Sequence, residues 1–224
     1  MLEKNKAIRM VDELRRQLIS NDIPLNVIDY GAGHPNDIRS QQQMSKGVEV
    51  VSSTKCYAAY GVKGADAEFL FSAILKAKPC TVLELGTCCG FSSILMSKAM
   101  PKSSIYTLEG SPELVQIAQE MHHKAGCGNI QIHTGRFVDI LPGLLPSIRP
   151  VDFAFIDGHH DRDATVQYFE MILPYMSYGG VMAFDDITWS DGMKEAWAAI
   201  CSHPVARYAD DNGKIGLIRV GECR

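Results

Sequence analysis

The segment from Glu84 to Gly90 combines an acid, two glycines and two adjacent cysteines in the spacing ExGxxxG. A dinucleotide-binding loop has the spacing GxGxxG, and a phosphate-binding loop carries Gly-Lys-Ser or Gly-Lys-Thr; the segment has neither pattern. It also contains no Lys or Arg. We therefore expect it to bind a ligand that is less anionic than a nucleotide phosphate, with glycines that let the backbone approach closely. A tight turn that needs glycine only for packing is the alternative.

A second acid follows at a position suited to the same ligand. Glu109 lies 25 residues after Glu84 and ends the next predicted strand. There its carboxylate can accept hydrogen bonds from a ribose diol.

The adjacent cysteines Cys88 and Cys89 allow three interpretations: a redox pair, a metal-binding pair, or small side chains in a binding loop. The chain has seven cysteines, an odd number, and none of them has the spacing CxxC. A disulfide between neighbouring cysteines is strained, and further soft metal ligands at short spacing are missing. The sequence favours reduced thiols in a cytoplasmic protein.

Composition narrows the class of protein. The chain has 224 residues, of which 46% are hydrophobic and 21% charged, as in a typical globular protein. Its net charge is −4 and its basic residues do not cluster, so we expect no nucleic-acid partner. No apolar run reaches the roughly 20 residues of a membrane span, and the N-terminus lacks a signal-peptide core. We expect a cytoplasmic location and leave a homo-oligomer open.

Strand and helix patterns alternate from residue 80 onward. The predicted strands are 81–85, 104–109, 129–135, 151–157 and 179–186, and the predicted helices are 91–100, 112–126, 137–145 and 163–176. This alternation predicts a parallel sheet with helices on both faces. Two further strands, 205–209 and 214–220, flank Asn212-Gly213, a strong hairpin signal. The predicted fold is an α/β, Rossmann-like, seven-stranded and mostly parallel sheet with an antiparallel C-terminal hairpin.

The first 64 residues differ from the rest of the chain. Helical spacing predicts helices over 4–19 and 65–76, and residues 23–40 are predicted to be a long irregular segment because they are rich in Gly, Pro, Asn and Asp. We expect residues 1–64 to form an N-terminal helix followed by a cap or lid segment, with the main domain at 65–224. A role in packing alone is the alternative for the lid segment.

The informative side chains stand at the ends of the predicted strands. In open α/β sheets, ligands bind beyond the carboxyl ends of the strands. Four of the five predicted parallel strands end in acids, and the positions are Glu84 with its glycine loop, Glu109, Gly135, Asp157 and the pair Asp185-Asp186. The sequence therefore predicts one binding site along this edge.

The run "VLELGTCCGFSS", followed by "IYTLEG", resembles the cofactor motifs of class I S-adenosylmethionine-dependent methyltransferases. The resemblance covers about residues 65 to 220. It implies that the glycine loop contacts the methionine part of S-adenosylmethionine and that Glu109 binds the ribose. Where many relatives have Gly-Asp beside the adenine, this chain has Gly135-Arg136, followed by Phe137, which can stack on a purine. The implied cofactor-binding residues are Glu84, Gly86, Thr87, Cys88, Gly90, Phe91, Ser92, Glu109, Gly110, Gly135, Arg136, Phe137 and Asp157.

A second pair of motifs, "FIDGHHDRD" and "FDDITWSDGM", resembles the metal-dependent small-molecule O-methyltransferases of the catechol type and the sugar-modifying type. The resemblance implies a divalent cation held by Asp157, Asp185 and Asp186. Three carboxylates suit Mg²⁺ or Ca²⁺, and a cation would relieve their mutual repulsion. The alternative is that these acids cap helices or bind the backbone.

Methyl transfer to a hydroxyl needs an aligned nucleophile and a base that removes its proton. The resemblance places such a base near His159 and His160, with Asp157 beside it, and loop histidines bonded to backbone or a neighbouring acid are the alternative. Trp189 is a candidate wall of the pocket, and His122 is expected to face solvent from its helix. The sequence therefore predicts methyl transfer from S-adenosylmethionine to a hydroxyl of a small molecule. A metal-independent N-methyltransferase and a non-catalytic S-adenosylmethionine-binding protein are the alternatives.

Overall fold

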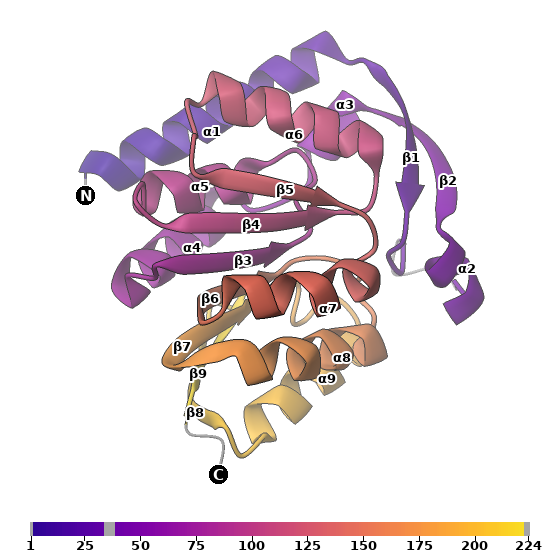
Figure 1. Cartoon of the computed structure of the whole chain (residues 1–224). Helices are drawn as coiled ribbons and strands as arrows, with labels where there is room; N and C mark the ends of the chain where they lie inside the picture. Colours follow the sequence, from indigo (N-terminus) through magenta and orange to yellow (C-terminus); the bar gives the residue numbers. More distant parts are fainter. Residues whose placement is uncertain (1, 34–38, 222–224) are drawn as a thin grey trace.

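A seven-stranded sheet forms the centre of the molecule. The computed structural model describes residues 2–33 and 39–221. The strand order is β5-β4-β3-β6-β7-β9-β8 (Figure 1), with bounds β3 (Thr81–Leu85), β4 (Ser104–Glu109), β5 (Ile130–Thr134), β6 (Val151–Ile156), β7 (Met176–Phe184), β8 (Ala206–Asp211) and β9 (Gly216–Val220). Strands β3 to β7 are parallel, whereas β9 is antiparallel to both β7 and β8. The predicted fold class, with its C-terminal hairpin, is confirmed.

Helices cover both faces of the sheet and form two hydrophobic cores. One core contains α1 (Leu2–Asn21), α4 (Gly64–Ala77), α5 (Phe91–Ala99) and α6 (Pro112–Lys124). The other contains α7 (Phe137–Ile148), α8 (Arg162–Ile172) and α9 (Asp191–Ser202), with the 3-10 turn η1 (Leu173–Tyr175) after α8. Each central strand contributes alternate side chains to the two cores, as Phe155 and Ile156 do on β6. This two-sided burial explains why these strands read as continuous apolar runs.

The segment predicted to be irregular contains a strand. β1 (Pro24–Asp29) pairs antiparallel with β2 (Val48–Ser53), and α2 (Gln41–Lys46) lies between them, with α3 (Thr54–Ala58) after β2. We call β1, α2, β2 and the described residues that connect them the N-terminal ribbon. The prediction was wrong for Pro24–Asp29 because proline is tolerated at the first residue of a strand, and pairing with β2 buries Val27 to 2% exposure.

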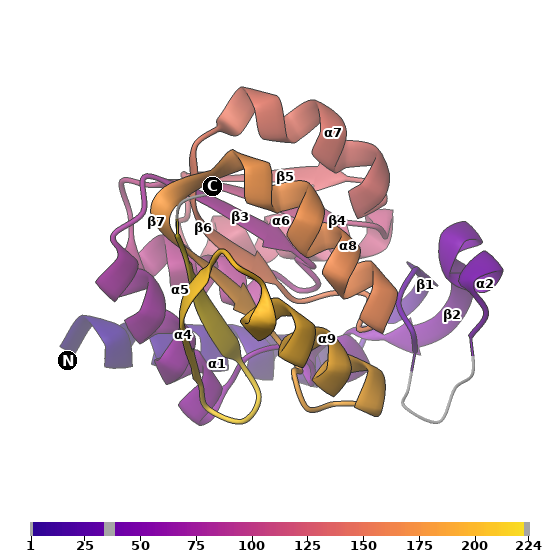
Figure 2. The same cartoon turned by 90° about the horizontal axis from the view of Figure 1, so that it is seen from below.

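The N-terminal ribbon lies beyond the carboxyl ends of the parallel strands, toward which the arrows of β3, β4 and β5 point in Figure 1. Figure 2 shows the ribbon at one side of the helices and the sheet. It is therefore positioned to cover ligands bound at this edge of the sheet.

Helix α1 packs against the helices that cover the main sheet. Its apolar face belongs to the same hydrophobic core as α4 and α5. The buried guanidinium of Arg15 donates hydrogen bonds to the carbonyl oxygens of Ala58, Tyr60 and Val62, and it lies 4.3 Å from the centre of the Phe91 ring. Arg15 thus fixes the segment after α3 against the core. The division of the chain at residue 64 stays a prediction.

Within residues 2–33 and 39–221, no helix combines the length and the apolar composition that crossing a bilayer requires.

Candidate active site

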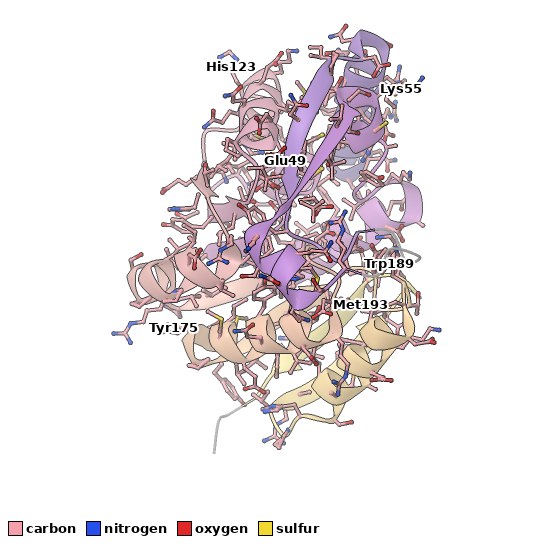
Figure 3. All side chains as sticks on the ribbon, turned by 90° about the vertical axis from the view of Figure 1, so that its right-hand side faces the viewer. Glu49, Lys55, His123, Tyr175, Trp189 and Met193 are labelled. Atoms are coloured by element: carbon pink, nitrogen blue, oxygen red, sulfur yellow. The ribbon has the colours of Figure 1, made fainter. Side chains whose placement is uncertain are left out.

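A cavity of about 900 Å³ lies between the carboxyl edge of the sheet and the N-terminal ribbon. Figure 3 looks onto this edge with the ribbon in front of it. Small organic ligands are typically bound in cavities of this size. Ten predicted site residues contribute to its wall: Gly86, Cys88, Glu109, Arg136, Phe137, Asp157, His159, His160, Asp185 and Asp186. Seven predicted residues do not line it, namely Glu84, Thr87, Gly90, Phe91, Ser92, Gly110 and Gly135.

Gly86 brings the loop after β3 against the loop after β6. Its φ is +99°, and a Cβ atom at this position would lie 1.9 Å from the carbonyl oxygen of Asp157. No side chain fits there, so any other residue would push the two loops apart. We expected glycine in this loop so that a ligand could approach the backbone closely. At Gly86, the group that approaches closely is the backbone of the loop after β6.

Gly90 serves packing as well. Its φ is +82°, and a Cβ atom there would lie 2.6 Å from Nε2 of His122. His122 is buried, its Nε2 lies 2.8 Å from the Ser93 hydroxyl, and burial lowers the pKa of His122 to about 4. The expectation that His122 faces solvent was wrong, because its side of α6 packs against α5.

Glu84 lies beneath the glycine loop rather than in the cavity wall. Its Oε2 accepts a hydrogen bond from the Thr107 hydroxyl at 2.5 Å, and that hydroxyl lies 2.6 Å from the hydroxyl of Thr87. Its Oε1 is buried and has no hydrogen-bond partner among the described residues. Burial raises the pKa of Glu84 to about 7, although the nearby hydroxyl groups of Ser92 and Thr107 oppose this rise. The geometry makes Glu84 a support of the loop.

Glu109 presents a fixed carboxylate to the cavity. Its Oε2 accepts a hydrogen bond from the Cys88 amide at 2.8 Å, and its Oε1 accepts one from the Ser111 amide at 3.0 Å. Burial raises the pKa of Glu109, while these backbone amides lower it. A carboxylate has about four acceptor positions. Both oxygens therefore retain an acceptor position for a vicinal diol.

The two adjacent thiols are not joined. All six cysteines within the described residues are free, whereas Cys223 lies outside them. A hydrogen bond with Cys89 and burial raise the pKa of Cys88 well above the usual value for a thiol. Cys88 is thus a protonated loop side chain whose backbone amide orients Glu109.

The N-terminal ribbon contributes an aromatic side chain that the sequence analysis did not select. The ring of Tyr30 covers Gly110, where a Cβ atom would lie 2.6 Å from the ring. Tyr30 and Tyr57 both line the cavity on the side of Glu109. Tyr30 follows β1 directly, and only the folded structure shows that its ring lies beside Gly110 and lines the same cavity as Glu109.

Hydrogen bonds fasten the ribbon to the sheet on two sides. The Ala32 amide donates to the His159 carbonyl at 2.7 Å, and Arg136 donates to the Ser45 carbonyl at 2.7 Å. Arg136 also binds both carboxylate oxygens of Asp139. Arg136, the residue before α7, therefore holds the ribbon, and its neighbour Phe137 lines the cavity.

The three aspartates predicted to bind a metal do lie together, but a lysine lies among them. Nζ of Lys214 donates to Asp185 and forms an ion pair with Asp186 at 2.8 Å. Burial and the neighbouring Asp185 carboxylate raise the pKa of Asp157 well above that of an ordinary aspartate. In the described part of the chain, no group of three or more His, Cys, Asp or Glu side chains has an arrangement that could hold a metal ion. With Lys214 in this position, the site does not fit the predicted Mg²⁺ or Ca²⁺.

The two histidines differ in their surroundings. Nδ1 of His159 lies 2.8 Å from the Tyr168 hydroxyl, its Nε2 is buried without a partner among the described residues, and burial lowers the pKa of His159. Nε2 of His160 lies 3.7 Å from Asp157 and 3.9 Å from Asp186. The His160 ring is 5.8 Å from that of Trp189, which also lines the cavity. His160 is therefore the histidine beside the acids.

The chain is similar in sequence to known methyltransferases. A family model described as a methyltransferase domain matches residues 83–187. A catechol O-methyltransferase from Niastella koreensis is 36% identical over 121 residues, which cover 53% of this chain and 53% of that protein. A tRNA (guanine-N(7)-)-methyltransferase from Salmonella choleraesuis is 25% identical over 173 residues, covering 73% of this chain and 72% of that protein.

The fold has solved counterparts. The O-methyltransferase from Bacillus cereus, solved in complex with SAH, matches with a TM-score of 0.64 at 22% identity, covering 73% of this chain and 84% of that chain. Sheet order, terminal hairpin and glycine loop thus define a Rossmann-like methyltransferase fold. Residues 83–187 are therefore similar to a methyltransferase domain, and they lie within a fold that is shared with a solved O-methyltransferase. The chain spans about half the length of the catechol relative that it matches.

Proposed function

We propose that this protein transfers a methyl group from S-adenosylmethionine to a hydroxyl of a small-molecule acceptor. The observation that carries the proposal is the Glu109 carboxylate, fixed by two backbone amides in the wall of a cavity of about 900 Å³. The similarity to a catechol O-methyltransferase supports a hydroxylated acceptor.

The residues around Glu109 would hold the methyl donor. In this proposal Glu109 binds the ribose diol, and the loop from Gly86 to Cys88 contacts the methionine part. Tyr30 and Phe137 line the same cavity and offer aromatic faces to the adenine. Asp157 follows the neighbouring strand and contacts this loop through Gly86. Glu84 and Thr87 support this loop from behind through the hydroxyl of Thr107.

The acceptor would lie between the donor and the acidic end of the cavity. Trp189 and His160 line that end, and the N-terminal ribbon covers it from outside. His160 takes the proton of the acceptor hydroxyl, the new O–C bond forms, and the C–S bond of the sulfonium breaks to leave a neutral thioether. The chain's own residues supply orientation and a base, and we assign no step to a divalent cation.

Calorimetry of S-adenosylmethionine binding tests the proposal. Glu109→Ala removes a charged acceptor of two hydrogen bonds, each contributing about 1.5 kcal/mol or more, so we expect the affinity to fall roughly 100-fold. Glu113→Ala is the matched control, since this acid lies on the first turn of α6 and does not line the cavity. Equal affinities of Glu109→Ala and the unmutated protein would remove the basis of the proposal.

Methyl transfer to nitrogen is the second candidate, because Asp157, Asp185 and Asp186 at one end of the cavity would attract an amine and one relative in the comparison is a tRNA (guanine-N(7)-)-methyltransferase. Labelled S-adenosylmethionine offered with small phenols or with small amines separates the two reactions. Binding without transfer to either class of acceptor would instead support a non-catalytic protein. A cytoplasmic location and a homo-oligomer stay predictions.

A further inference from the structure

The loop between β8 and β9 carries a lysine into the active-site cavity. The backbone of Lys214 is held on both sides, because its amide donates to Oδ1 of Asn212 at 3.0 Å and its carbonyl accepts from the Ile187 amide at 3.0 Å. The Thr188 hydroxyl also donates to the Gly213 carbonyl at 2.7 Å. The hairpin loop is therefore tied to the loop after β7, which carries two of the three aspartates.

The ammonium group of Lys214 lies between acidic side chains. It donates to Oδ2 of Asp185 and lies 2.8 Å from Oδ1 of Asp186. Two carboxylates at ion-pairing distance favour the charged form of this amine. A divalent cation binds carboxylate oxygens at about 2.0 to 2.6 Å. It would need the same oxygens and would be repelled by the ammonium.

We infer that Lys214 takes the place of a divalent cation and binds the acceptor oxygen directly. An ammonium group has three N–H donors, and the two aspartates occupy two of its directions. Lys214 lines the cavity and 35% of its side chain is exposed, so the third donor can face a ligand. Asp185 and Asp186 thus position a lysine instead of a metal ion.

This inference rests on the proposed methyl transfer to a hydroxyl. As His160 takes the hydroxyl proton, negative charge develops on the acceptor oxygen, which then bonds to the methyl carbon while the C–S bond breaks. A fixed ammonium beside that oxygen stabilises the developing charge. Methyl transfer should therefore proceed without Mg²⁺ or Ca²⁺.

Thermal unfolding of the whole chain tests the inference without any acceptor. Melting is measured in EDTA-treated buffer and again with added Mg²⁺ or Ca²⁺, for the unmutated protein, for Lys214→Met and for the control Lys194→Met. Lys194 is 57% exposed and pairs with Asp191 on α9, outside the cavity. We expect only Lys214→Met to respond, with a rise in melting temperature of about 5 °C at saturating metal, because its acids are freed.

Two melting results would overturn the inference. One is an unmutated protein that Mg²⁺ stabilises as strongly as it stabilises Lys214→Met. The other is a folded Lys214→Met that no metal stabilises, because the acids would then not form a cation site. If Lys214→Met does not fold, the test uses the unmutated protein only. A higher melting temperature with metal then contradicts the inference, and an unchanged melting temperature supports it.

Activity separates this inference from the proposed function. With catechol and other small phenols as probe acceptors, we expect transfer of labelled methyl to continue in excess EDTA. Lys214→Met should lower kcat roughly 100-fold and leave the calorimetric affinity for S-adenosylmethionine unchanged. Transfer that requires added Mg²⁺ would contradict the role of Lys214 while supporting methyl transfer. Failure to bind S-adenosylmethionine would contradict the proposed function and leave the melting test of Lys214 valid.

Discussion

Replacing Glu84 by glutamine should change how the stability of the protein depends on pH. Burial raises the pKa of Glu84 from 4.5 to about 7 in the folded protein, so the folded state binds this proton more tightly than the unfolded state. The protonated carboxyl contributes stability that is fully present below about pH 4.5 and is lost as the pH rises through 7. At 1.36 kcal/mol per tenfold change, the loss amounts to about 3 kcal/mol.

Glutamine keeps the shape of the side chain and an oxygen that accepts from Thr107, but it cannot ionise. Its amide nitrogen has no partner at the position of Oε1, and this cost does not depend on pH. The difference in unfolding free energy between Glu84→Gln and the unmutated protein should therefore shift by about 3 kcal/mol in favour of the variant between pH 4 and pH 9, roughly the span of the two pKa values.

Urea denaturation at several pH values in this range measures that difference. Comparing the two proteins at each pH cancels the contributions of groups that they share. Glu113→Gln removes a charge from the half-buried first turn of α6, where the Ser111 hydroxyl donates to this acid, and it shows the pH response of an acid that is not fully buried. A difference for Glu84→Gln that stays constant within about 0.5 kcal/mol across the range would refute the reasoning, because Glu84 would then ionise as easily in the folded protein as in the unfolded chain.

Three further substitutions test the geometry, each beside a control. Gly86→Ala should cost roughly 3 kcal/mol or more of stability in urea denaturation, because its Cβ meets a backbone carbonyl, whereas Gly126→Ala, also at positive φ but in open space, should cost about 1 kcal/mol. Arg15→Met should cost about 3 kcal/mol, since it strands three carbonyls, and its exposed neighbour Arg16→Met should stay within about 0.5 kcal/mol; equal costs would contradict the fastening role. His160→Ala should lower methyl transfer to catechol roughly 100-fold, whereas the control His159→Ala should lower it far less.

The sheet and the grouping of acids could be predicted because local signals determine them. The strands at 81–85 and 104–109 have the predicted bounds, since each is a short apolar run between turn residues. Asp157 and the Asp185-Asp186 pair end neighbouring parallel strands, and the ends of such strands share one edge. Their convergence followed from topology without knowledge of any side-chain position.

The remaining features depend on contacts between distant segments. β1 was missed because its partner strand lies about twenty residues further along the chain and because Pro24 and Asn26 indicate a loop when they are read locally. Lys214 was missed because it enters the site from a hairpin loop about 30 residues beyond the acids. A pattern of acids predicts a cation between them, but it does not tell whether that cation is a metal or an ammonium group.

The 1.9 Å approach at Gly86 has a consequence for how this site can diverge. The loop that we propose to contact the methyl donor and the loop that carries Asp157 meet without a side chain between them, so a shift of one backbone requires a shift of the other. A substitution that reshapes the acceptor end by shifting the main chain at Asp157 must also displace the donor loop. New acceptor preferences are therefore more accessible through the N-terminal ribbon and the hairpin loop, whose side chains reach the cavity from outside this joint.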